Sequence, residues 1–91
     1  MRAKSSVQIV NSRVLVTEWR FEPGADTGTH VHAHDYVVVP MTSGILRLDE
    51  PTGVRDVHLL AGMSYARSAG VEHNVINAND HEFCFIEIEL L

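Results

Sequence analysis

The sequence has almost no cysteine, no cluster of basic residues and no long apolar run. Cys84 is the only cysteine among 91 residues, so no disulfide can form within the chain. The seven lysines and arginines are scattered and the formal net charge is −5, which argues against nucleic acid or an anionic membrane surface as a partner. No segment is long enough to span a bilayer, and the start MRAKSSVQIV lacks the apolar stretch of a signal peptide. We therefore expect a soluble cytoplasmic protein with no membrane partner.

A helical pattern is absent too. Short runs rich in β-branched and aromatic residues alternate with turns of glycine, proline, asparagine and aspartate at intervals of about 8–12 residues, which favours an antiparallel sandwich or barrel. The 91 residues suffice for one domain with one core. We therefore expect a single all-β domain over residues 1–91. Residues 1–6 are interpreted either as a flexible arm or as an edge strand exchanged with another subunit.

The last apolar run, from Phe83 to Leu90, shows a clear two-residue alternation. Such a strand presents one set of side chains to each face of a sheet. We expect the purely apolar set to face the core, with the set that contains two glutamates on the other side. The expected inward set is Cys84, Ile86, Ile88 and Leu90, and the expected outward set is Phe83, Phe85, Glu87 and Glu89. Cys84 is accordingly interpreted as a small buried hydrophobe rather than a nucleophile.

Three histidines, His30, His32 and His34, follow one another with a period of two, and His73 lies some forty residues later. Residues two apart on a strand share a face and lie about 6.6 Å apart along it. Metal–nitrogen bonds are only about 2.0–2.1 Å long, so two such histidines hold one ion only when a third donor arrives from elsewhere. His73 is the natural donor. The pattern therefore predicts a metal site, with unrelated surface histidines as the alternative.

Two spaced motifs resemble those of the cupin superfamily. The first runs from Gly24 to an H-x-H pair at His30 and His32. The second leads from Gly62 through Gly70 and His73 to Asn77, with Ser68 where cupins usually carry proline. The resemblance implies a small double-stranded β-helix (jelly-roll) barrel that holds a divalent metal on His30, His32 and His73.

The chain departs from the cupin pattern at the acidic ligand. Tyr36 stands where the glutamate would fall, and the closing glycine, Gly44, comes one residue late. The fourth ligand is therefore open: His34 fits a regular strand, and Tyr36 fits a chain that bends before it. Tyr36 and Asp35 are also the candidate catalytic residues, with packing beside the site and surface exposure as their alternative roles.

A nitrogen-rich site suits iron, manganese, nickel, cobalt, copper or zinc. A three-histidine set without carboxylate is similar to that of the thiol and diketone dioxygenases of the superfamily, which favours iron and a dioxygenase-like activity over isomerisation or hydrolysis. The segment HDYVVVPMTSG resembles stand-alone cupins, some of which are associated with catabolism of β-alanine or related small amino acids. The missing glutamate motivates a second hypothesis, a non-enzymatic binding module with a vestigial or empty metal site.

A small-molecule substrate or ligand is the partner that both hypotheses require. Arg20, Arg47 and Arg67 are the candidate cations for a ligand carboxylate, because a planar guanidinium group can form bidentate hydrogen bonds to it. Tyr65 is the candidate aromatic residue of the pocket. We also expect a homodimer, because a barrel this small leaves edge strands that natural proteins pair or cover.

Overall fold

The computed structural model describes all 91 residues, and its regular elements are strands alone. The nine strands are β1 (Lys4–Val10), β2 (Val14–Phe21), β3 (His30–Val31), β4 (Tyr36–Pro40), β5 (Gly44–Glu50), β6 (Gly53–Leu59), β7 (Tyr65–Arg67), β8 (Glu72–Asn77) and β9 (Phe83–Leu90). The all-β prediction is confirmed. No helix has the length and hydrophobicity needed to cross a membrane.

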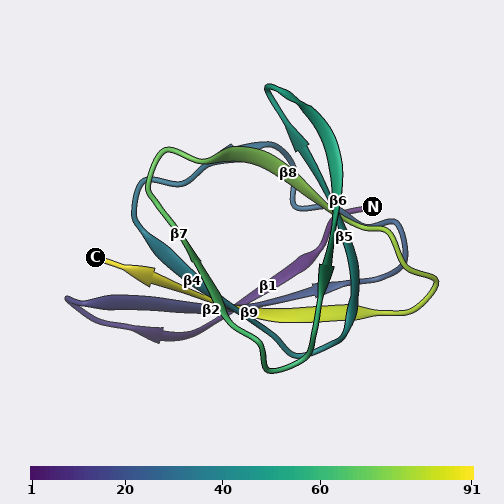
Figure 1. Cartoon of the computed structure of the whole chain (residues 1–91). Helices are drawn as coiled ribbons and strands as arrows, with labels where there is room; N and C mark the ends of the chain where they lie inside the picture. The colour runs from purple at the N-terminus through teal and green to yellow at the C-terminus, as the bar shows by residue number, and fades with distance from the viewer.

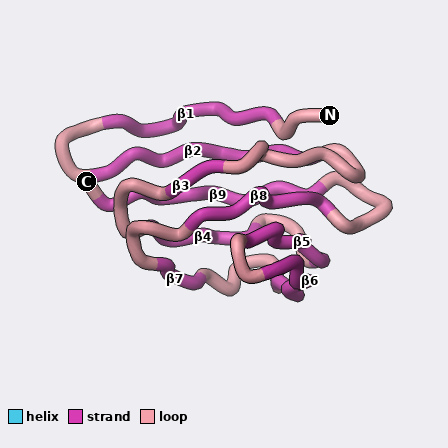
Figure 2. The backbone as a smooth tube through the Cα atoms, turned by 90° about the horizontal axis from the view of Figure 1, so that it is seen from above, coloured by secondary structure: helices cyan, strands magenta, loops and turns pink.

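The strands form two antiparallel sheets that enclose a common interior. One sheet has five strands in the order β1-β2-β9-β4-β7, and the other has four in the order β3-β8-β5-β6. In Figure 1, β8 lies across the interior from β2 and β9, and Figure 2 shows β1 at the outer edge of its sheet. This is the double-sheet barrel that the two motifs imply.

Strand pairing shows which side chains of the larger sheet share a face, and the burial of Tyr36 and Val38 in the core identifies the inner one. Directly paired residues point to the same face, as do residues two apart along a strand. Tyr36 is paired with Arg67 and Glu89, and the next row in the same direction joins Val38 to Tyr65 and Glu87. The side chains of these two rows therefore share the inner face.

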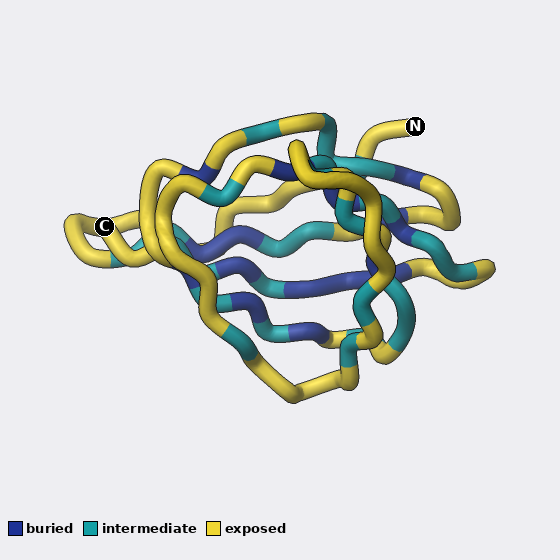
Figure 3. The backbone as a smooth tube through the Cα atoms, turned by 45° about the horizontal axis from the view of Figure 1, so that its top comes forward, coloured by how far each residue is buried: buried dark blue, intermediate teal, exposed yellow.

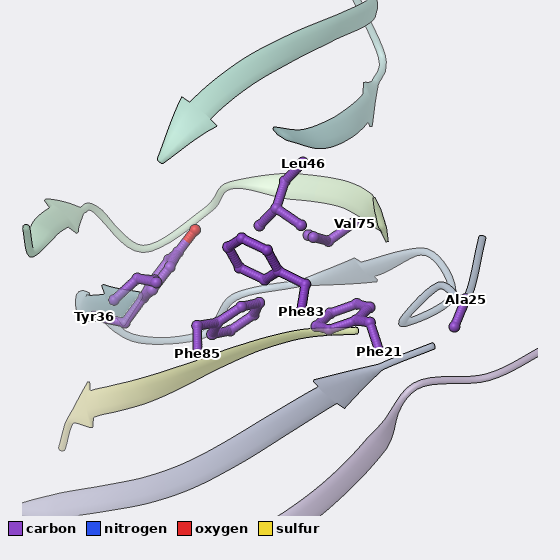
Figure 4. Close-up of a cluster of buried hydrophobic side chains, with 8 residues drawn as sticks. Phe21, Ala25, Tyr36, Leu46, Val75, Phe83 and Phe85 are labelled. Atoms are coloured by element: carbon purple, nitrogen blue, oxygen red, sulfur yellow. The ribbon is translucent and has the colours of Figure 1, made fainter. Parts of the chain in front are cut away.

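The hydrophobic core fills one end of the barrel. Its centre is formed by phenylalanines of the larger sheet, which meet aliphatic side chains of β5 and β8 (Figure 4). The cluster consists of Phe21, Ala25, Tyr36, Val38, Leu46, Val75, Phe83 and Phe85. Buried positions concentrate along the inner strands, whereas the connecting loops are exposed (Figure 3). The barrel thus has a closed apolar end and a polar end.

The prediction for the faces of β9 was wrong. Phe83, Phe85 and Glu87 are buried on the inner face, and Leu90 on the other face is 46% exposed. Phe83 and Phe85 pack in the core, where two aromatic rings remove more apolar surface from water than Cys84 and an isoleucine would. Cys84 is buried, as expected, but on the outer side of the sheet.

Residues 4–10 form the edge strand β1 of the larger sheet. Strand β1 pairs with β2 from Lys4 opposite Arg20 to Val10 opposite Leu15. Before it, the amide of Ala3 donates to the carbonyl of Asp26 at 2.7 Å. Every residue of β1 is exposed, so this edge strand rests on backbone pairing with little side-chain burial.

Candidate metal centre and cavity

Three histidine side chains converge at the polar end of the barrel. His30 on β3 is paired with His73 on β8, and His32 follows β3. The Nε2 atom of His32 lies 3.0 Å from Nε2 of His30 and 3.1 Å from Nε2 of His73. The main chain of His32 is tied to the loop before β8, because its amide donates to the Val71 carbonyl at 2.9 Å and its carbonyl accepts from the Gly70 amide at 2.8 Å. Backbone pairing thus brings together residues some forty positions apart.

The hydrogen bonds of His30 determine which ring nitrogen is free. Its Nδ1 lies 2.9 Å from the carbonyl oxygen of Gly28, and because a carbonyl can only accept, Nδ1 carries the proton. Nε2 of neutral His30 therefore presents a lone pair to the other two histidines. Gly28 has φ of 79°, a left-handed conformation that glycine adopts without strain, and this turn directs its carbonyl toward the ring.

Burial keeps the other two histidines neutral. His32 and His73 are 6% and 7% exposed. This burial, reinforced by the proximity of His30, lowers the pKa of each to about 4. Neutral imidazole is the form that binds a metal ion, so both rings are ready to coordinate at neutral pH.

The donor set fits a divalent transition metal. The nitrogens of His30, His32 and His73 form a group whose candidate ligand atoms all lie within 4.8 Å of one another. Two nitrogens bound to one ion at about 2.0–2.1 Å are about 3 Å apart when the bonds are near right angles. The observed separations agree with this value. A three-histidine metal site is therefore chemically feasible here, and the donors alone do not select the metal.

The structure places the three neighbouring candidates differently. Tyr36 is 2% exposed, and its ring stacks on His32 with centroids 3.9 Å apart. Burial, followed by the nearby Tyr65 and Glu87, raises the pKa of Tyr36 to about 12, so it stays a phenol. His34 is exposed and lies outside the three-histidine group. Asp35 is also exposed, and its carboxylate accepts from the Ala69 amide at 2.8 Å, which joins two loops at the rim.

A cavity of about 300 Å³ adjoins the histidines. Its lining comes from both sheets and includes Tyr36, whose hydroxyl end points away from β9 into the interior in Figure 4. Its polar and aromatic lining consists of Trp19, Thr27, His30, Tyr36, Glu50, Arg55, Tyr65, Arg67, His73 and Glu87. The remaining lining is aliphatic, apart from Phe85. A pocket of this volume is at the lower end of the range for small-molecule sites.

The three predicted pocket arginines do not lie together. Arg67 lines the cavity, as does Tyr65, and the Arg67 guanidinium lies 4.7 Å from the centre of the Tyr65 ring. Arg20 and Arg47 were wrong as pocket residues, because they lie on other surfaces. Arg20 pairs there with Glu18 and Glu82, and Arg47 pairs with Asp56 across β5 and β6.

Sequence reasoning missed three charged residues of the cavity. Glu50 and Arg55 form an ion pair in its wall. Glu87 is 8% exposed, and burial, followed by the neighbouring carboxyl group of Glu89, raises its pKa to about 8. Glu87 and Glu89 also form a candidate ligand group with His32. The only available signal was the alternation of β9, which gives two possible faces without saying which one is buried.

The fold and the three-histidine site define a small single-domain cupin. The cupin-domain family model matches residues 17–89, and the chain belongs to this family. The chain is 58% identical over 89 residues to the β-alanine degradation protein BauB of Pseudomonas aeruginosa, with 98% of this chain and 94% of that protein covered.

Solved structures agree. A cupin domain from Bordetella pertussis Tohama I has a TM-score of 0.98 and 58% identity, over 99% of this chain and 94% of that one. The polyketide cyclase RemF of Streptomyces resistomycificus has a TM-score of 0.76 at 18% identity, over 97% of this chain and 66% of that one. At this identity the second likeness concerns the fold alone.

Proposed function

We propose that the chain is a metal-dependent cytoplasmic enzyme that acts on a small polar metabolite in the breakdown of β-alanine or a related compound, with oxygenation favoured over isomerisation or hydrolysis. The observation that carries the proposal is the convergence of three Nε2 atoms at 3.0 and 3.1 Å beside a cavity of about 300 Å³. The similarity to BauB supports the substrate context.

His30, His32 and His73 would hold the ion, with iron favoured over manganese, nickel, cobalt, copper or zinc. A bound ion of this kind supplies Lewis acidity, and iron also supplies redox chemistry toward oxygen. The surrounding residues orient the histidine rings. The Gly28 carbonyl sets the tautomer of His30, and the stacked ring of Tyr36 packs against one face of His32. Aliphatic side chains line much of the cavity beside the site.

Oxygen uptake is the test of this activity. Protein reconstituted anaerobically with ferrous iron is mixed with oxygen and a panel of small amino acids, thiols and diketones, and consumption is followed together with product analysis. We expect turnover of at least one compound by the wild type and the His34→Ala control, and none by His73→Ala. Equal turnover by His73→Ala would refute the assigned ligands.

A non-enzymatic binding module is the second candidate, and one observation favours it. Tyr36 takes the place of the usual acidic ligand, and with a pKa of about 12 it remains an uncharged phenol. In that case the barrel captures a small acid without changing it. Thermal stabilisation by a compound that is recovered intact, under ferrous iron and oxygen, would support binding over catalysis.

We also propose that two copies associate through the outer face of the five-stranded sheet. Val16 is paired with Ile88, which is paired with Val37, and Ile86 is paired with Val39. These side chains share the face opposite the core, so one apolar row crosses three strands. A twofold pair would set this patch against itself.

A further inference from the structure

The cavity contains one cation that the protein leaves free of any carboxylate partner. Arg55 and Arg67 are its only basic residues other than histidine. Arg55 is paired with Glu50, whereas Arg67 forms no ion pair and donates only to the carbonyl of its neighbour Ala66, at 2.9 Å. The planar guanidinium of Arg67 therefore remains available for a ligand carboxylate.

The cavity also contains a carboxyl group without a cation. Glu87 is 8% exposed, and no lysine or arginine lies within ion-pair distance of it or of Glu89, its neighbour on the same inner face. All five ion pairs of the chain involve other residues. A buried carboxylate is costly unless it is paired, and for this reason Glu87 on its own is largely protonated at neutral pH. A ligand that brings a positive charge would stabilise its ionised form.

These two groups stand on opposite sides of one strand. Arg67 is on β7 and Glu87 on β9, with β4 between them. Their backbones lie two strand spacings apart across the sheet, about 10 Å, and two residues apart along it, because Arg67 is paired with Tyr36 and Glu87 with Val38. Both residues line the same cavity of about 300 Å³, so a small molecule in it can contact both groups.

The groups around these two are also free to bind a ligand. The hydroxyl groups of Tyr36 and Tyr65 make no hydrogen bond within the protein, as the partners of all side-chain hydrogen bonds lie elsewhere. The indole Nε1 of Trp19 is buried without a partner, and Trp19 lines the same cavity. A buried donor without a partner is uncommon and costly, and a polar ligand would satisfy it.

We propose that the cavity binds a small zwitterion, with its carboxylate on Arg67 and its ammonium group on Glu87. Glu87 belongs with His32 to one candidate ligand group, so the ammonium end lies on the side of His32 and the carboxylate end on the β7 side. This inference rests on the proposed function, because it names the substrate class of the same site. A small ω-amino acid, which carries its two charges at opposite ends, meets the requirement.

Isothermal titration of intact protein with three probes tests the zwitterion. β-Alanine carries both charges, propionate lacks the ammonium group and ethylamine lacks the carboxylate. We expect β-alanine to bind at least tenfold more tightly than either fragment. Arg67→Gln and Glu87→Gln should each weaken β-alanine at least tenfold, whereas Arg47→Gln, at an arginine outside the cavity, should bind as the wild type does. Equal binding of propionate and β-alanine, unchanged binding by Glu87→Gln, or no binding of any probe would overturn the inference.

Metal content of the same samples separates this inference from the proposed function. Zwitterion preference in protein that binds no metal would support the inference while refuting the metal enzyme. One equivalent of metal without zwitterion preference would do the reverse. A second equivalent of metal that disappears in Glu87→Gln would assign the two carboxyl groups to an ion, and would overturn the ammonium site.

Discussion

At the scale of single residues, the site combines groups whose protonation responds to folding in opposite directions. His32 and His73 have a pKa near 4 in the folded protein, below the ordinary histidine value of 6.5. Glu87 has a pKa near 8, above its ordinary value of 4.5. The histidines therefore favour unfolding as the pH falls from 6.5 to 4, and Glu87 favours unfolding as the pH rises from 4.5 to 8.

We predict that metal-free protein is most stable near pH 6.5. Between pH 4.5 and 6.5 the unfolded state binds up to two more histidine protons than the folded state and one proton fewer on Glu87. Its net excess of bound protons means that stability increases with pH in this interval. Between pH 6.5 and 8 Glu87 is the main group among these three whose protonation differs between the folded and the unfolded state. Because the folded state keeps this proton, stability decreases as the pH rises. Denaturant unfolding in the presence of a chelator measures this profile. Glu87→Gln should abolish the decrease above pH 6.5, and a decrease of unchanged size would contradict the assigned burial of Glu87.

The same residues show what the sequence could predict about the site. His30, His32 and His73 were identifiable because two spaced motifs contain them, and antiparallel pairing brings His30 opposite His73. Glu87 and Glu50 were not identifiable, because glutamates usually face water and their inward orientation depends on strand register. Arg20 and Arg47 were chosen for their chemistry alone, and the strand register places both on outer faces, where they pair with nearby acids.

At the scale of elements, Asn77 at the end of β8 anchors the closed end of the barrel. It is 1% exposed, and its side-chain Nδ2 lies 3.1, 3.2 and 2.9 Å from the carbonyl oxygens of Phe21, Glu22 and His81. The sequence indicated only a residue that supports the second motif. Its connections to three segments required the folded structure.

Asn77→Ala should lower the free energy of unfolding by about 3 kcal/mol, because buried carbonyl groups lose their donor. Chemical denaturation measures the change. Asn11→Ala, at an exposed turn residue that also accepts backbone hydrogen bonds, is the control and should cost about 1 kcal/mol. Metal content per folded chain should remain that of the wild type. A loss of stability no larger than that of the control would show that the side-chain network contributes little.

The faces of β9 illustrate why an alternating strand does not reveal its own orientation. One set of side chains is wholly apolar and the other is half glutamate, yet the set with two glutamates is the buried one. The sequence suggested the opposite because it gives no sign that one end of the barrel is polar. The outer set, which includes Ile86 and Ile88, remains apolar on the molecular surface.

At the scale of the whole molecule, this outer face predicts a homodimer. Light scattering or sedimentation should give a dimer across the micromolar range. Ile88→Lys, in the middle of the apolar row, should shift the protein to monomer because it places a charge against its copy. Val54→Lys, at a residue that is 61% exposed on β6, is the matched control and should remain dimeric. A monomeric wild type would refute the association, and a dimer that persists in Ile88→Lys would move it to another surface.

The barrel as a whole was predictable because its signals are spread along the chain. Strand runs, turn residues and the spacing of two motifs agree with one another, so local and global preferences select the same fold. The charged residues that line the cavity come from strands that are distant in sequence, such as those of Arg67 and Glu87, and their proximity arises only when these strands assemble into a sheet.

Elemental analysis tests the central claim most directly, namely that His30, His32 and His73 form one metal centre. Tag-free protein purified without chelator is measured for moles of each transition metal per chain, beside His73→Ala and the exposed-histidine control His34→Ala. We predict close to one equivalent, with iron favoured, in the wild type and in His34→Ala, and loss of that metal in His73→Ala with the fold retained. A wild type that stays free of metal after reconstitution, or a His73→Ala variant that keeps one equivalent, would contradict the claim.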